Sequence, residues 1–177
     1  EEIENEIKKN KEIKKFNLNH FQDKNKLYDE VAKLILKNNI IGFFNDKMEF
    51  GARALGNRSI LANPCSDKIQ DIINSKIKKR EMFRPFAPAI LLEKKNEWFD
   101  NDLSNPYMSA VESINFDKRK LIPAVTHVDG TGRVQTVTKE MNSDFYLLIQ
   151  KFNQLSNVPI LLNTSFNENE PIVMSPK

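Results

Sequence analysis

Two amphipathic helical segments, far apart in the chain and separated by short apolar runs, most restrict the folds open to this sequence. In residues 27–38 and 144–155 the apolar side chains recur every three or four positions, as on one face of a helix. Residues 40–44, 86–92 and 158–162 are short apolar runs of the kind that forms buried strands. Helices mixed with such strands predict a single α+β or α/β domain.

The remaining segments give weaker signals. Residues 67–78 predict a third helix, and residues 107–113 and 123–128 predict strands. Two polar stretches, 45–59 and 163–167, follow apolar runs directly, so we expect both to be loops beside the sheet.

Composition narrows the class of protein. The 177 residues suffice for one ordinary domain, and 40% apolar with 29% charged residues is typical of a globular chain. No apolar run approaches the roughly 20 residues of a membrane span. Charged residues occur along the whole of the first fifteen positions and leave no apolar stretch there, which argues against a signal peptide. With one Cys and two His, neither a disulfide framework nor a zinc site is predicted. We therefore expect a cytoplasmic protein without a membrane partner.

The ends of the chain suggest its domain organisation. It begins at Glu1 and stops just after a strand-like run, so we expect a fragment of a longer protein. Residues 1–25 alternate Lys and Glu with sparse Ile, and predict a charged linker or helical segment. Residues 26–177 are the predicted domain.

Arginine is scarce in a chain rich in lysine, with 6 Arg against 21 Lys. A guanidinium group grips phosphate or carboxylate with two parallel hydrogen bonds, which an ammonium group cannot do. Arginines concentrated in a few segments of such a chain therefore indicate an oxyanion site. Surface ion pairing is the alternative explanation.

Two motifs carry most of these cations. The segment from Gly51 to Ser59 has the two-glycine spacing of a phosphate-binding P-loop but lacks its Lys-Ser/Thr pair, so any anion there is held by side chains. Residues 78–84 place several cations before an apolar strand, where they could neutralise a polyphosphate. The alternative for this second segment is a solvated basic stretch.

Two further motifs gather polar groups. Residues 126–133 set Thr, His, Asp and Arg around a glycine turn, which indicates either a ligand site or an ordinary hairpin turn. Residues 163–167 follow a buried strand, where ligand-binding groups concentrate, although capping explains such residues equally well.

Together these segments resemble the C-terminal region of the O-carbamoyltransferase family, which includes antibiotic-tailoring and nodulation-factor carbamoyltransferases. The resemblance covers about residues 27–177 and rests on four motifs in the same order: MEFGARALGNRSILA (48–62), IKKREMFRPFAPAIL (77–91), IPAVTHVDGTGRVQTV (122–137) and VPILLNTSFNENEPIV (158–173).

The resemblance implies a YrdC-like α+β domain with a twisted mixed sheet flanked by helices. Such domains bind ATP and help to form carbamoyl-adenylate from carbamoyl phosphate. A separate N-terminal domain of the same protein, with its own metal site, then transfers the carbamoyl group to a substrate hydroxyl. We also expect a Mg²⁺ ion to bridge the phosphates, held mostly by substrate oxygens and water, and the sequence names no protein ligands for it.

The family's functional residues carry over onto matching positions. Its ATP-binding residues match Arg53, Arg84, Arg133 and Asn163. The related Lys-x-Arg and Ser-x-Asn signatures, to which the resemblance gives a catalytic role, match Lys78, Arg80, Ser165 and Asn167. One departure is Ala52, where the family usually has Pro; it leaves the neighbouring guanidinium in place.

Two alternative functions stay open on the sequence. A threonylcarbamoyl-adenylate synthase would use threonine and bicarbonate in place of carbamoyl phosphate. A non-catalytic RNA-binding module could use the same cations, but it would need aromatic side chains interleaved with them as stacking platforms. A net charge of +3 is too small to predict a nucleic-acid partner.

Overall fold

A computed structural model of the chain describes residues 2–176 and has a mixed five-stranded sheet at its centre. The strands are β1 (Ile41–Phe44), β2 (Arg58–Ala62), β3 (Ala87–Leu91), β6 (Gln135–Val137) and β7 (Ile160–Ser165), with β4 (Glu112–Ser113) and β5 (Thr131–Gly132) forming a separate two-stranded sheet. The order in the large sheet is β1-β2-β7-β3-β6; only the β3–β6 pair is parallel. The α+β class with a mixed sheet is therefore confirmed.

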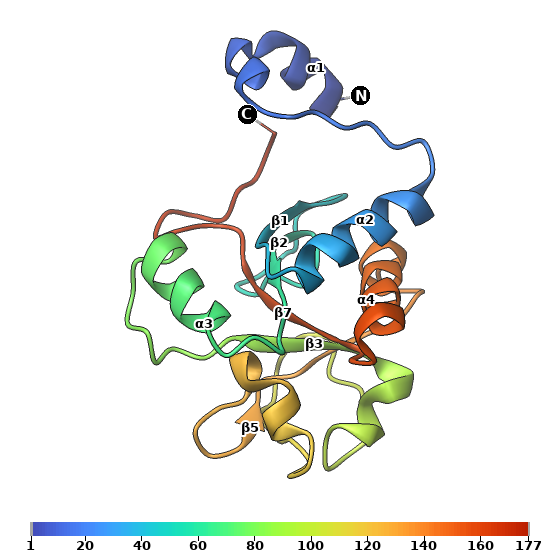
Figure 1. Cartoon of the computed structure of the whole chain (residues 1–177), viewed down its shortest axis with the longest axis vertical. Coiled ribbons are helices and arrows are strands. Elements are labelled where there is room, and N and C mark those ends of the chain that lie inside the picture. The colour runs from blue at the N-terminus through green and yellow to red at the C-terminus, as the bar shows by residue number, and fades with distance from the viewer. Residues whose placement is uncertain (1, 177) are drawn as a thin grey trace.

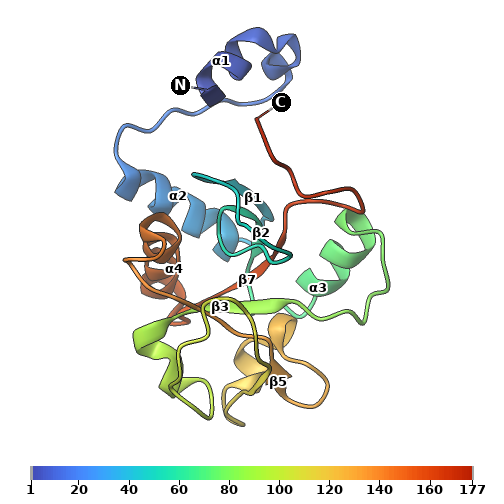
Figure 2. The same cartoon turned by 180° about the vertical axis from the view of Figure 1, so that it is seen from behind.

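Helices cover both sides of this sheet. The α-helices are α1 (Glu2–Lys9), α2 (Lys24–Leu36), α3 (Ile69–Ile72) and α4 (Ser143–Ser156), and α3 continues as a π-helix over Ile73–Ile77. Figures 1 and 2 show α2 and α4 side by side on one side of the strands, with α3 on the other. The buried faces of α2 and α4 join the apolar strands in one hydrophobic core.

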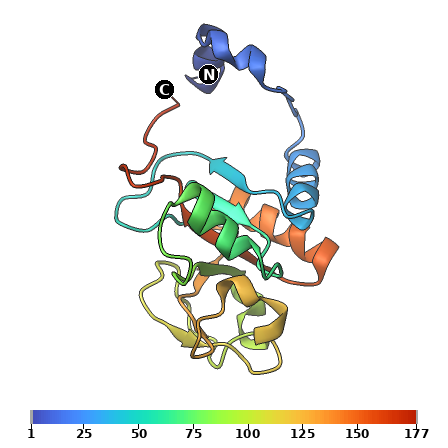
Figure 3. The ribbon, with the colours of Figure 1, turned by 60° about the vertical axis from the view of Figure 1, so that its left-hand side comes forward.

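The N-terminal segment lies apart from the sheet. Figures 1 and 3 show α1 and the 3-10 helix that follows it (Lys11–Lys15) near the C-terminal end of the chain, joined to α2 by an extended stretch. Ile3 and Pro176 line the same small hollow between these two ends. None of the helices within residues 2–176 is long and apolar enough to cross a membrane.

The helix and strand predictions for residues 27–38, 144–155, 40–44 and 86–92 are confirmed within two or three residues. The side chain of Asn142, which accepts a hydrogen bond from the Phe145 amide at 3.0 Å, caps α4. The predicted helix over 67–78 is shorter and passes from α to π geometry.

Two strand predictions are wrong. Residues 123–128 begin as a 3-10 helix over Pro123–Val125, because Pro123 lacks an amide hydrogen and suits the first position of a helical turn. Of residues 107–113 only Glu112–Ser113 form a strand, and Met108 has a left-handed φ of 55° that no strand accommodates.

The prediction of a loop at residues 163–167 is partly wrong. Strand β7 continues through Asn163, Thr164 and Ser165, because β2 pairs with this segment from one side and β3 pairs with Asn163 from the other. The backbone groups of this polar segment are thus satisfied within the sheet, which fixes the direction of its side chains.

Candidate functional site

A cavity of about 280 Å³ lies beside the C-terminal end of β7. It is lined by residues of six segments: Ala52, Arg53 and Ala54; Arg80; Pro85, Phe86 and Ala87; Met108; His127 and Arg133; and Asn163, Thr164 and Ser165. Its size approaches the lower end of the roughly 300–1,000 Å³ typical of small-molecule sites.

Three guanidinium groups from distant parts of the chain meet at this cavity. Arg53, Arg80 and Arg133 all line it, as do Asn163 and Ser165. Five of the eight residues predicted from the sequence therefore share one hollow. Of the others, Arg84 lies outside the lining: its Nε pairs with Glu81 at 3.0 Å on the surface.

Arg80 is the most constrained of the three guanidiniums. Its Nε donates to the side-chain oxygen of Asn74 at 2.8 Å, and its guanidinium carbon lies 5.0 Å from the centre of the Phe86 ring. Burial, followed by the nearby charge of Arg84, lowers the pKa of Arg80. Arg84 thus adds to the positive potential near the cavity without lining it.

The loop that carries Arg53 is organised by two residues that sequence reasoning did not single out. One carboxylate oxygen of Glu49 accepts from the amides of Leu55 at 2.7 Å and Asn57 at 2.8 Å. The buried Arg58 donates from Nη1 to the carbonyls of Asn45, Asp46 and Asn57, at 2.7, 3.0 and 3.0 Å. Arg58 therefore holds the loop and leaves Arg53 as its exposed arginine.

Asn163 ties the same loop to the sheet. Its amide nitrogen donates to the carbonyl of Ala54 at 3.0 Å and to Gln135 Oε1 at 2.8 Å. Gln135 in turn donates to the carbonyl of Leu55 at 2.9 Å. Within residues 2–176 the side-chain oxygen of Asn163 is buried without a hydrogen-bond partner, so this part of the site has an unused acceptor.

Lys78, Ser165 and Asn167 form one cluster at the end of β7. Lys78 Nζ donates to the carbonyls of Ser165 and Asn167 at 2.6 and 2.7 Å, and to their side-chain oxygens at 3.2 and 3.0 Å. Burial, together with the charge of Arg80, lowers the pKa of Lys78 to about 8. Lys78 and Asn167 are not in the cavity lining, so in this arrangement they hold Ser165 in place beside it.

His127 faces the cavity in a defined tautomer. The Thr131 hydroxyl donates to Asp129 at 2.7 Å, so it can only accept from His127 Nδ1, which lies 3.0 Å away. Burial lowers the pKa of His127, Arg133 lowers it further, and Asp129 opposes both. The predicted glycine-turn motif is thus a turn that also places His127 and Arg133 in the cavity wall.

Sequence analysis does not identify the apolar part of the lining as part of a site. Met108 lies in residues 107–113, which predict a strand, and Phe86 lies in the apolar run 86–92, which predicts a buried strand. Within residues 2–176, no group of three or more His, Cys, Asp or Glu side chains is placed to hold a metal ion.

Comparison with known proteins assigns the chain to a family. Residues 32–177 match the family model described as Carbamoyltransferase C-terminus. The chain is 49% identical over 148 residues to nodulation protein NolNO of Sinorhizobium fredii, covering 81% of this chain and 22% of that protein. Nodulation protein NolO of Bradyrhizobium diazoefficiens is 47% identical over 140 residues, covering 77% of this chain and 26% of that protein.

An uncharacterised protein of Methanocaldococcus jannaschii is similar along this whole chain. It is 38% identical over 179 residues, which cover 100% of this chain and 29% of that protein. The chain thus spans about a quarter of the length of these curated relatives.

Proposed function

Because the chain belongs to the carbamoyltransferase C-terminal family, we propose that it is the ATP-binding part of an O-carbamoyltransferase. In this proposal the cavity binds ATP and supports formation of carbamoyl-adenylate. The missing part of the longer protein then passes the carbamoyl group to a substrate hydroxyl. Both ATP and carbamoyl phosphate are cytoplasmic metabolites, so the proposal places the protein in the cytoplasm.

The observation that carries this proposal is the meeting of Arg53, Arg80 and Arg133 at one cavity. In a chain that uses lysine for most of its positive charge, three guanidiniums from separate segments surround a hollow large enough for part of a nucleotide. Such groups bind phosphate oxygens bidentately. The unused acceptor of Asn163 adds an uncharged partner for the ligand.

The chemistry asked of these residues is mainly electrostatic. Water first cleaves carbamoyl phosphate, and the products are carbamate and phosphate. A carbamate oxygen then bonds to the α-phosphorus of ATP, the bond from that phosphorus to the pyrophosphate oxygen breaks, and the products are carbamoyl-adenylate and pyrophosphate. Negative charge grows on the departing pyrophosphate. Fixed guanidinium donors that face this charge stabilise the transition state more than the ground state.

Magnesium fits this arrangement as an ion carried by the nucleotide. The substrates together bring more negative charge than the three guanidiniums balance. Mg²⁺ is commonly bound through substrate phosphates and water with few protein ligands. The metal site expected for the transfer step would belong to the N-terminal domain of the full-length protein.

The test is ATP–pyrophosphate exchange that depends on carbamoyl phosphate, measured in the full-length protein. We expect Arg53→Ala and Arg133→Ala each to lower the exchange rate by about 10²–10³-fold, because each removes a donor to the transition-state anion. Lys120→Ala, which changes an exposed cation that does not line the cavity, is the matched control and should stay within about twofold of wild type.

Two outcomes would contradict the proposal. One is exchange at the wild-type rate in the Arg53→Ala and Arg133→Ala variants. The other is exchange that requires threonine and bicarbonate instead of carbamoyl phosphate, which would identify a threonylcarbamoyl-adenylate synthase.

A further inference from the structure

Met108 is a buried apolar residue that belongs to the cavity rather than to the core. Its exposed fraction is 7%, and it lines the cavity. Among the described residues it is absent from the main hydrophobic cluster that unites the sheet with α2 and α4. Its backbone holds a left-handed φ of 55°, a conformation that a side chain of this size adopts only where its surroundings enforce it.

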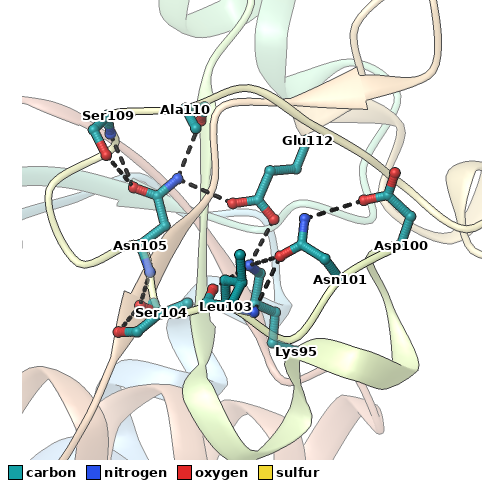
Figure 4. Close-up of polar contacts among 10 residues, drawn as sticks. Lys95, Asp100, Asn101, Leu103, Ser104, Asn105, Ser109, Ala110 and Glu112 are labelled. Carbon is teal, nitrogen blue, oxygen red and sulfur yellow. Dashed lines mark hydrogen bonds and ion pairs between the residues drawn. The ribbon is translucent and has the colours of Figure 1, made fainter.

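The side chain of Asn105 enforces that conformation. Its oxygen accepts from the amide of Ser109 at 2.9 Å and from the Ser109 hydroxyl at 3.0 Å, which closes the turn around Met108. Its nitrogen donates to the carbonyl of Ala110 at 3.2 Å and to Glu112 Oε1 at 3.1 Å. Figure 4 shows Asn105 between the turn and Glu112.

The carboxylate that holds Asn105 is itself held by a buried cation. The side chain of Lys95 is fully buried and pairs with Glu112 Oε2 at 2.6 Å. Lys95 Nζ also donates to the side-chain oxygen of Asn101 at 2.9 Å and to the carbonyl of Leu103. A chain of contacts therefore runs from Lys95 through Glu112 and Asn105 to the turn that carries Met108 (Figure 4).

The lining of the cavity combines apolar and cationic side chains. Pro85, Phe86, Ala87 and Met108 contribute apolar surface, the three arginines contribute charge, and the Arg80 guanidinium lies over the Phe86 ring. A ligand that matches this lining has both anionic groups and a flat or apolar part. A thioether is polarisable and makes favourable contacts with aromatic rings, so Met108 is suited to a heteroaromatic base.

We propose that Met108 contacts the nucleobase of the bound nucleotide, and that Lys95 and Glu112 are positioning residues that act on Met108 through Asn105. This inference rests on the proposed function, because it assigns the uncharged end of the same ligand. It separates base recognition, by the turn at 105–110, from phosphate recognition, by the arginines. Binding of ATP and of inorganic tripolyphosphate should therefore respond differently to changes in the turn.

The test measures the dissociation constants of ATP·Mg and of tripolyphosphate·Mg by calorimetric titration of the 177-residue chain. Met108→Ala should weaken ATP binding by about tenfold, because it removes most of a buried apolar contact. It should change tripolyphosphate binding by less than about twofold. Met108→Leu keeps the volume and should restore most of the ATP affinity.

The positioning role is tested with the double substitution Lys95→Met/Glu112→Leu. Replacing a buried ion pair by apolar residues commonly leaves a protein folded, which thermal unfolding will verify. This variant should also weaken ATP but not tripolyphosphate. Tyr107→Ala, on the same turn but 63% exposed and outside the cavity lining, is the matched control and should leave both constants unchanged.

Three results would overturn the inference. If Met108→Ala leaves ATP binding unchanged, Met108 does not contact the base, although the proposed function stands. If it weakens tripolyphosphate as much as ATP, Met108 only supports the fold of the cavity. If the wild-type chain binds neither compound, the proposed ATP site itself is wrong and the inference falls with it.

Discussion

Two cationic segments reach the cavity, residues 45–58 and residues 78–84, and they support their arginines differently. In the first, Arg58 donates to three carbonyls of its own loop and stacks on Phe44, with 3.5 Å between the guanidinium carbon and the ring centre. In the second, Lys78 donates to Ser165 and Asn167, which lie at the far end of the chain. The first segment is held largely by its own Arg58, and Asn163 and Gln135 add contacts from the sheet. The second segment is held to the end of β7 by the buried Lys78.

Because of this difference, substitutions in the two segments should disturb different parts of the molecule. Disturbing the first segment should alter mainly its own loop and the packing of α4 against it. Disturbing the second should also release the end of β7, because the same ammonium group binds both partners of that strand end. The predictions below probe each segment in turn.

The largest effect is expected for Gly56→Ala in the first segment. Gly56 has a φ of 101°, and an added Cβ would overlap the ring of Phe145 on α4. Strain and overpacking together should lower the free energy of unfolding by about 4 kcal/mol, measured by urea denaturation. Gly51→Ala is the matched control: its φ of 140° is also strained, but its Cβ would meet open space, so about 1–2 kcal/mol is expected. Equal losses of stability in the two variants would show that the Phe145 ring moves aside at little cost.

The second prediction compares two arginines of the second segment. Arg80→Ala should lower carbamoyl-phosphate-dependent exchange by about 10²-fold, because Arg80 lines the cavity. Arg84→Ala should lower it by less than about tenfold, since Arg84 pairs with Glu81 and acts on the cavity only through its charge. Equal losses would mean that Arg84 turns into the cavity when the ligand binds, as the family resemblance implies.

The third prediction concerns the support of that segment. Lys78→Met leaves half-buried oxygens of Ser165 and Asn167 without their donor, and should lower the free energy of unfolding by about 2 kcal/mol. Lys79→Met is the matched control, because Lys79 is 62% exposed and its ion pair among the described residues is with Glu168 at the surface. It should change stability by less than about 0.5 kcal/mol. Similar losses in both variants would remove the distinction between the two cations.

The sequence predicts the structure correctly where the local spacing of apolar residues determines it. Helices α2 and α4 and strands β1 and β3 follow from the spacing of their apolar residues. The sequence does not predict the structure where contacts with distant segments determine it. Ser165 looks like a loop residue until β2 pairs beside it, and Pro123 starts a helical turn rather than a strand.

The site shows the same limit. The scarcity of arginine correctly indicated that some arginines gather at one site. Nothing in the sequence, however, distinguishes Arg53, which lines the cavity, from Arg58, which donates hydrogen bonds within its own loop. Lys95 lies in a stretch of charged residues typical of a solvated surface, yet its side chain is fully buried. Burial distinguishes these cations, and burial depends on the whole fold.

The most specific effect is expected from pH. In the folded chain the pKa of Lys78 is lowered to about 8, mainly because burial disfavours its charged form, whereas an unfolded lysine keeps a pKa of 10.5. Between these values the unfolded state binds more protons than the folded state, so raising the pH favours the folded state.

The stability of wild type relative to Lys78→Met should therefore be constant from about pH 6 to 7.5 and increase from about pH 8 to 10.5. Urea denaturation of both proteins at each pH measures this, and the subtraction removes every other titrating group. Lys79→Met, compared with wild type in the same way, should show no such increase across that range. If the stability difference between wild type and Lys78→Met does not change with pH, the four oxygen atoms that accept from Lys78 offset the free-energy cost of burying its ammonium group. The second cationic segment would then be held as firmly as the first.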